Sequence, residues 1–95
     1  MPSYELVFIF NANLEEDDFS RTIGKINDLI TKLDGKVNET NQWGKRKLAY
    51  PIKRQTEGNY VLEKVQIKQT ALKELEANLK LTENVLRYLF IRENG

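Results

Sequence analysis

The sequence predicts an α+β fold in which two helices cover one face of a four-stranded antiparallel sheet. Two observations predict it. Apolar residues alternate, as in strands, over four segments, and they recur at spacings of three and four, as in helices, over two others. These segments follow the order strand, helix, strand, strand, helix, strand. A chain of 95 residues has the length of one domain with a modest core, so residues 1–95 are expected to form a single domain.

The first half of the chain predicts a central strand and a long helix. Both faces of the segment 4–10 are apolar, which indicates a strand inside the sheet. A turn-like segment follows, in which Asn13 is a predicted N-cap. The four acids at positions 15–18 suit the positive end of a helix dipole better than a metal site. Apolar residues then recur along one helical face, so we expect a helix from about Glu15 to Leu33, closed by Gly35.

The next predicted elements are two strands. Val37 to Ile52 can form a long strand that is irregular near Gly44, because a glycine within a strand often marks a bulge. Pro51 cannot donate a ladder hydrogen bond, which favours an edge strand. A turn at Glu57 to Asn59 is expected to lead into a strand from Tyr60 to Ile67. Glu63 interrupts its apolar parity, and either a bulge or a buried partner would resolve this.

The last helix and strand complete a split βαβ, or ferredoxin-like, order. Leu72, Leu75 and Leu79 predict a short helix with Thr70 as its N-cap, and residues 86–91 alternate as a final strand. In the usual topology of this fold the first and third strands are central. The sheet face without helices would carry Glu5, Val7, Ile9, Tyr60, Leu62, Arg87, Leu89 and Ile91. Such an apolar face indicates either a partner or a cover made by the chain's own loops.

Composition excludes several classes of function. Cys and His are absent, which removes disulfides, thiolate nucleophiles and the commonest zinc ligands, so no metal or cofactor is expected. The first apolar run is too short and too poor in cations for a signal peptide. No stretch approaches the roughly 20 apolar residues of a membrane span, and we expect a soluble intracellular protein without a membrane partner. The net charge of +1 does not by itself indicate a nucleic-acid partner.

Charge is nevertheless concentrated locally, in the segment that reads GKRKLAYPIK from Gly44 to Lys53. Five cations and no acid occur between Gly44 and Arg54. By strand alternation Leu48, Tyr50 and Ile52 share one face, expected to be buried, while Lys45 and Lys47 share the other. The pattern fits an anion-binding surface, and it equally fits a basic edge strand with an ordinary core face.

This segment resembles the signature of the bacterial-type family of the sixth protein of the small ribosomal subunit. The fixed positions of that signature are matched by Gly44, Arg46, Lys47, Leu48, Ala49, Tyr50, Ile52 and Lys53. The likeness continues through Tyr4 and Glu5, the loop from Asn11 to Leu14, Gly58, and the ending with Asn84, Val85 and Arg87. It implies a ferredoxin-like, non-enzymatic protein of the cytoplasmic or an organellar ribosome. It further implies binding to the central domain of small-subunit ribosomal RNA, as a heterodimer with the eighteenth protein of that subunit.

Candidate contact residues follow from charge and from the resemblance. Cations position proteins on phosphates, and the candidates for RNA binding are Arg46, Lys47, Lys53, Arg54, Arg87 and Arg92. The alternative for each is a solvated surface cation. The candidates for the partner-protein interface are Trp43, Lys45, Ala49 and Pro51. Trp43 could instead be buried against the first helix or a loop, and Tyr50 is expected in the core rather than as a stacking platform.

Three other functions compete with the ribosomal one. An acylphosphatase-like enzyme would use an arginine and an asparagine around a phosphate cradle, but Asn11 to Leu14 lacks the glycines of such a loop and precedes acids that would repel phosphate. An RNA-recognition module carries an aromatic motif that Asn59 to Ile67 does not match. A small-molecule regulatory dimer is permitted by the open apolar face. The resemblance favours a structural ribosomal role without a small-molecule substrate.

Overall fold

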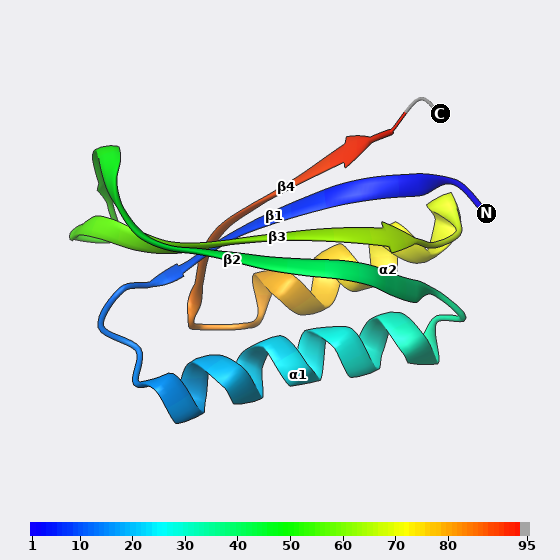
Figure 1. Ribbon diagram of the computed structural model, residues 1–95, viewed down its shortest axis with the longest axis horizontal. Helices are drawn as coiled ribbons and strands as arrows, with labels where there is room; N and C mark the ends of the chain where they lie inside the picture. The colour runs from blue at the N-terminus through cyan, green and yellow to red at the C-terminus, as the bar shows by residue number, and fades with distance from the viewer. Residues whose placement is uncertain (94–95) are drawn as a thin grey trace.

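The computed structural model describes residues 1–93, and its two helices cover one face of one sheet (Figure 1). The elements are β1 (Ser3–Asn11), α1 (Glu16–Lys32), β2 (Lys36–Ile52), β3 (Gln55–Gln66), α2 (Gln69–Lys80) and β4 (Val85–Arg92). The strand order is β2-β3-β1-β4, and every neighbouring pair is antiparallel. The ferredoxin-like prediction is confirmed, with β1 and β3 central and β2 and β4 at the edges.

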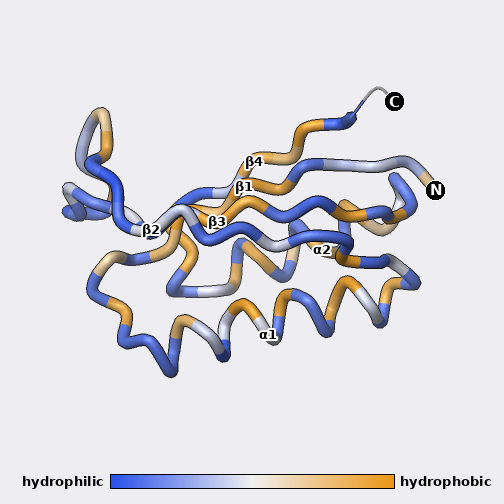
Figure 2. Tube along the Cα trace, viewed as in Figure 1, coloured by the Kyte–Doolittle hydropathy of each residue, from blue (hydrophilic) through white to orange (hydrophobic). Residues whose placement is uncertain are grey.

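The hydrophobic core lies between the sheet and the helices. Along β1 every second side chain faces the helices and is buried, from Tyr4 to Phe10. In Figure 2 hydrophobic and hydrophilic segments alternate along α1, as in an amphipathic helix. The apolar stripe of α1 packs on this surface, with the Phe19 ring edge-on to Phe10 at a centroid distance of 5.3 Å. Leu75 and Leu79 of α2 complete the layer. The apolar stripes of α1 and α2, packed against one face of the sheet, therefore account for the fold.

Both predicted N-caps are wrong, although both helices exist. Glu15 occupies the N-cap position of α1, and the backbone N–H of Asn13 donates to its neighbour Asn11 Oδ1 at 3.0 Å within the preceding turn. The acids of the first turn of α1 lie where the dipole favours them, as predicted. Lys68 is the N-cap of α2, because the Ala71 N–H already bonds the Lys68 carbonyl and so places Thr70 inside the first turn.

Asp34 and Gly35 have different roles at the C-terminal end of α1. Asp34 is the left-handed residue, with φ of 62°, and its N–H donates to the Thr31 carbonyl. The Gly35 N–H donates to the Ile30 carbonyl at 2.8 Å. A Cβ on Gly35 would lie 3.0 Å from that same carbonyl oxygen and 3.1 Å from the carbonyl oxygen of Gln66. Glycine is therefore needed here for close packing rather than for a positive φ.

The β2–β3 turn lies at Lys53 and Arg54, not at Glu57 to Asn59 as predicted. Both turn residues have positive φ, 48° and 67°, and Ile52 pairs with Gln55 across them. Gly58 lies inside β3, opposite both Arg46 and Asn11. A Cβ on Gly58 would collide with Ile9 Cγ2, so glycine at this position marks close approach of side chains rather than a turn.

The β2–β3 hairpin extends past the end of β1. β1 ends at Asn11, whereas β2 and β3 continue and curve away from the helices (Figure 1). The irregularity predicted near Gly44 is confirmed, since the register shifts between Gln42 and Gly44 and φ of Gly44 is 82°. A further shift falls between Lys47 and Ile52. We call residues 45–57, the part of the hairpin beyond Gly44 and before Gly58, the hairpin arm.

The core face predicted for the arm is only partly correct. Leu48 is buried, but it packs over Gly58 beside Ile9, on the sheet face opposite the helices. Tyr50 is 54% exposed, so its predicted place in the core is wrong. The physical reason is that neither β1 nor a helix accompanies the hairpin so far along, which leaves its alternating residues without a second layer. Ile52 is half-buried.

Candidate nucleic-acid and partner-protein interface

The hairpin arm gathers five exposed cations. Lys45, Arg46 and Lys47 follow the bulge in β2, and Lys53 and Arg54 form the turn at the tip. The part of the chain that the structure describes has two ion pairs, Arg21 with Asp18 and Lys80 with Glu76, and both lie on helices. None of the arm's cations forms an ion pair within the described residues, although Glu57 lies opposite Lys47 on the neighbouring strand. With one acid against five cations, the arm keeps positive charge available to an external anion.

The strand pairing distributes these cations over two faces. Arg46 lies opposite Gly58, in the row of the sheet that includes Asn11 and faces away from the helices. Lys45 lies opposite Asn59, whose row includes the buried Phe10 and faces the helices. Lys47 follows the parity of Lys45, as predicted. The arm therefore presents positive charge on both sides and at its tip.

Arg87 of β4 joins the base of the arm, whereas Arg92 does not. The Arg87 guanidinium carbon is 5.3 Å from the centroid of the Tyr50 ring, within cation–π distance. Arg92 pairs with Tyr4, near the N-terminal end of β1, and five residues of strand place it about 17 Å from Arg87. Five of the six predicted RNA-binding residues therefore lie at one end of the molecule. Sequence reasoning missed Tyr50 as an exposed aromatic side chain next to a cation.

The four residues predicted to contact a partner protein are all exposed. Trp43 is the extra residue where the register shifts between Gln42 and Gly44, and its 47% exposure excludes burial against α1. Ala49 and Pro51 are exposed on the arm, as is Lys45. A contact between these residues and a partner stays a prediction.

The sheet face opposite the helices has the predicted composition. Val7, Ile9, Tyr60 and Leu62 form half-buried rows across the central strands, and they pair as Val7 with Leu62 and Ile9 with Tyr60. On β4, Leu89 lies opposite Val7 and continues that row, and Ile91 lies opposite Glu5 on the same face. Leu89 and Ile91 are 57% and 44% exposed. The arm covers this face at one end, through Leu48 and Tyr50. The remainder is open and apolar, as a partner-binding surface would be.

Glu63 is accommodated by buried partners, not by a bulge. It is 1% exposed and pairs with Leu6, on the face that the helices cover. Thr40 Oγ1 of β2 donates to its Oε2 at 2.9 Å, and the Asn27 amide nitrogen of α1, turned toward the carboxylate, lies 2.7 Å from Oε2 and 3.0 Å from Oε1. Burial raises the pKa of Glu63, while both hydrogen bonds act in the opposite direction. The carboxylate thus joins β2, β3 and α1, and its role is structural.

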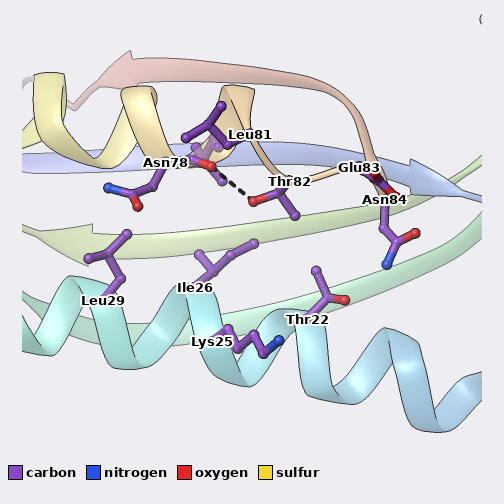
Figure 3. Close-up of a pocket in the computed structure, with 10 residues that line it drawn as sticks. Thr22, Lys25, Ile26, Leu29, Asn78, Leu81, Thr82, Glu83 and Asn84 are labelled. Carbon is purple, nitrogen blue, oxygen red and sulfur yellow. Dashed lines mark hydrogen bonds between the residues drawn. The ribbon is translucent and has the colours of Figure 1, made fainter.

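A groove of about 440 Å³ lies on the helix layer, between α1 and the end of α2 (Figure 3). Thr22, Lys25 and Leu29 line it from α1, and Leu81 and Asn84 from the other side. Its lining includes one cation and one acid, Lys25 and Glu83, and no arginine. An acylphosphatase-like site would need an arginine, and the loop from Asn11 to Leu14 does not line the groove either, so the groove gives no support to that alternative.

The described residues also lack two other kinds of site. Among residues 1–93 no group of three or more acidic side chains is placed to hold a metal ion. Within the same residues, neither helix has the length and apolar character that crossing a membrane requires.

The fold and the exposed surfaces define a small ferredoxin-like binding domain, with a cationic arm and an open apolar sheet face. Residues 3–92 match the family model described as Ribosomal protein S6, and the chain belongs to that family. This is a family of ribosomal proteins and not of enzymes, in agreement with the sequence analysis.

Relatives from bacteria resemble the chain over nearly its full length. The small ribosomal subunit protein bS6 of Desulforudis audaxviator is 39% identical over 94 residues, which is 99% of this chain and 100% of that protein. The protein of the same name from Dictyoglomus turgidum is 43% identical over 89 residues, covering 94% of this chain and 92% of that protein.

Solved structures agree on the fold. The crystal structure of 30S ribosomal protein S6 from Thermotoga maritima superposes with a TM-score of 0.91 at 28% identity, covering 97% of this chain and 87% of that one. The C-terminal domain of the MgtC protein from Mycobacterium tuberculosis reaches a TM-score of 0.66 at 10% identity, over 98% of this chain and 88% of that domain. This second likeness shows the fold alone.

Proposed function

We propose that this structural component of the small ribosomal subunit binds the central domain of the subunit's RNA together with the eighteenth protein of that subunit. Membership in the ribosomal protein S6 family supports the place in the subunit. The single observation that carries the RNA contact is the hairpin arm, where five exposed cations form no ion pair within the described residues.

The arm suits phosphate binding better than base recognition. Lysine and arginine side chains on a projecting hairpin can follow an irregular RNA backbone, and such contacts position a protein without reading sequence. Arg46, Lys47, Lys53 and Arg54 are the proposed phosphate contacts, and Arg87 lies beside them through Tyr50. Arg92 is a weaker candidate, because it lies at the opposite end of β4.

The partner protein is proposed to contact the exposed edge of β2 and the open apolar face. Trp43 is the proposed anchor, since a half-exposed tryptophan loses much apolar area on binding and Trp is enriched among interface hot spots. Lys45, Ala49 and Pro51 would border it. With a net charge of only +1, the chain gains little from charge alone, so a second protein would supply much of the affinity for RNA.

The salt dependence of RNA binding tests this proposal. Each phosphate contact contributes slightly less than one unit to the slope of log affinity against log salt concentration. Changing Arg46 and Lys47 together to Ala should flatten that slope by about one to two units. Changing Lys25 and Lys32 of α1 to Ala removes the same charge from the helix layer and should leave the slope nearly unchanged. An unaltered slope in the arm variant would contradict the proposal and would move the RNA contact to Arg87 and Arg92.

A further inference from the structure

The outer edge of β4 is unprotected, in contrast to the outer edge of β2. Edge strands usually carry charges, proline or bulges that prevent another strand from pairing with them. β2 has all three, including Pro51 and several register shifts. Over the described residues Arg87 to Arg92, β4 has no proline and no register shift, and its sequence RYLFIR contains four apolar or aromatic residues.

The hydrogen-bonding parity of β4 shows which of its backbone groups are free. The Glu93 N–H donates to the Ser3 carbonyl at 2.9 Å, which continues the ladder between β4 and β1. In an antiparallel pair the backbone groups of alternate residues point toward the neighbouring strand. The groups of Arg87, Leu89, Ile91 and Glu93 therefore point toward β1, and those of Tyr88, Phe90 and Arg92 point outward.

We propose that this edge pairs with β4 of a second copy of the chain, antiparallel about a two-fold axis at Phe90. In this register the outward-pointing residues of the two strands meet one another, as a hydrogen-bonded ladder requires. Arg87 then lies opposite Glu93 of the second copy, an opposite-charge pair that the two-fold axis repeats. Leu89 lies opposite Ile91 of the second copy, and Tyr88 opposite Arg92, so apolar and cation–π contacts fill the remaining cross-strand positions.

Helix α2, which lies next to β4, is compatible with the two-fold axis proposed at Phe90. Tyr88 of β4 is partly buried and packs against the core that the helices cover. Burial and the Glu76 carboxylate of α2 raise the pKa of its phenol. That side carries Lys73, Glu76, Ala77 and Lys80, followed by Leu81, which is 82% exposed. Ala77 is small and the charges around it have both signs, so this side of α2 does not present a single sign of charge to a second copy.

The self-complementary charges favour a second copy over another occupant. A two-fold interface brings the same surface from both copies together, so each favourable pair must occur twice. Arg87 and Glu93 satisfy this condition at equal distance on either side of Phe90. The pairing would join two four-stranded sheets into one and would shield Leu89 and Ile91, which are exposed in the single chain. This association goes beyond the proposed role in the ribosome and does not depend on it.

Charge reversal tests the register. Sedimentation equilibrium of the full chain between about 10 μM and 1 mM should show a monomer–dimer equilibrium, a range suited to an interface of modest area. Arg87→Glu and Glu93→Arg should each weaken dimerisation by at least about tenfold, since each places like charges opposite one another at two symmetric positions. The double variant should restore it. Lys25→Glu on α1 is the control and should leave the dissociation constant unchanged.

Amide hydrogen exchange gives a second readout that does not depend on variants. The N–H groups of Tyr88, Phe90 and Arg92 should gain protection as the protein concentration rises, whereas those of Leu89 and Ile91 should change little. A chain that stays monomeric up to about 1 mM would overturn the proposal. So would single charge reversals without effect, a double variant that is not restored, or protection of the outward N–H groups only when another protein is added.

Discussion

At the residue scale, Glu63 is the side chain whose chemistry departs most from its surroundings. Its carboxyl group has a pKa above the ordinary value of 4.5 because burial disfavours the charged form. The folded state therefore binds more protons than the unfolded state above that pH, and stability falls as pH rises through the folded-state pKa. Glu63→Gln should abolish this fall. Measured by urea unfolding, the stability of the variant relative to the native chain should increase from pH 4.5 up to the folded-state pKa of Glu63 and stay constant above it.

Glu57→Gln on the hairpin arm is the matched control for Glu63. Its carboxyl group is exposed, so the substitution should leave the pH profile of stability close to that of the native chain. If Glu63→Gln instead lost stability relative to the native chain as pH rose, the ionised carboxylate would be favourable in the fold. The hydrogen bonds from Thr40 and Asn27 would then outweigh burial.

Asp34 offers a second prediction at this scale. Its φ of 62° is a conformation that costs any residue with a Cβ more than it costs glycine. Asp34→Gly should raise the free energy of unfolding by roughly 0.5–1 kcal/mol, measured by chemical denaturation. Gly35→Ala is the contrasting variant, because its Cβ would press on backbone carbonyl oxygens and should destabilise the fold. A loss of stability in Asp34→Gly would show that the aspartate has a favourable interaction at the helix end.

The residue scale also shows where sequence reasoning stops. Helix α1 could be predicted from its apolar stripe, but its N-cap could not, because the residue at that position, Glu15, makes no side-chain capping hydrogen bond. Glutamate is also not among the residues that favour an N-cap. The break in parity at Glu63 was visible in the sequence. Its resolution was not, since Thr40 and Asn27 lie 23 and 36 positions away along the chain and only the packing of α1 and β2 on β3 brings them to the carboxylate.

At the element scale, the turn of the β2–β3 hairpin was missed for a physical reason. Turns in which both central residues have positive φ favour asparagine and glycine, and a lysine–arginine pair carries no such signal. Gly58 is the stronger turn signal in the sequence, but glycine is needed there because a Cβ would collide with the Ile9 side chain. The position of Tyr50 was mistaken for a related reason, because alternation predicts which residues share a face and not whether a second layer covers that face.

The same turn allows stability and RNA binding to be separated. Replacing Lys53 with Asn and Arg54 with Gly places the favoured residues at the two positive-φ positions and should raise stability by roughly 0.5–2 kcal/mol. It also removes two proposed phosphate contacts and should flatten the salt slope of RNA binding by about one to two units. Thermal unfolding and a salt titration measure the two effects. Opposite effects on stability and on RNA binding are expected, and an unchanged slope would mean that the tip of the arm does not meet phosphate.

At the scale of the whole molecule, the strand order and the segregation of charge could be read from the sequence. The position of Pro51 predicted that β2 is an edge strand, and the double apolar face of β1 predicted that it is central. The distribution of the cations was predicted only in part. Arg87 and Arg92 are five residues apart on one strand, and only the antiparallel register shows that one lies next to the arm while the other lies at the far end of β1.

The charge and the exposed apolar surface of the whole molecule predict that it binds ribosomal RNA cooperatively with the eighteenth protein. A net charge of +1 limits the affinity that the chain alone can gain from phosphates, while the open sheet face and exposed Trp43 leave apolar area to be covered. At one fixed salt concentration, binding to the central domain of the small-subunit RNA should be weak for the chain alone and at least about tenfold tighter with the eighteenth protein present, which corresponds to a coupling free energy of about 1.4 kcal/mol.

Trp43→Ala should remove most of this enhancement, because it truncates the proposed anchor of the partner protein and leaves the cations of the arm in place. The weak binding of the variant alone should therefore match that of the native chain, including its salt slope. Arg46→Ala with Lys47→Ala should do the reverse, weakening RNA binding with or without the partner. If the native chain bound RNA with equal affinity with and without the partner, the proposal that the arm binds RNA while the sheet face binds the partner would be contradicted. All of the binding free energy would then come from the chain's own contacts with RNA.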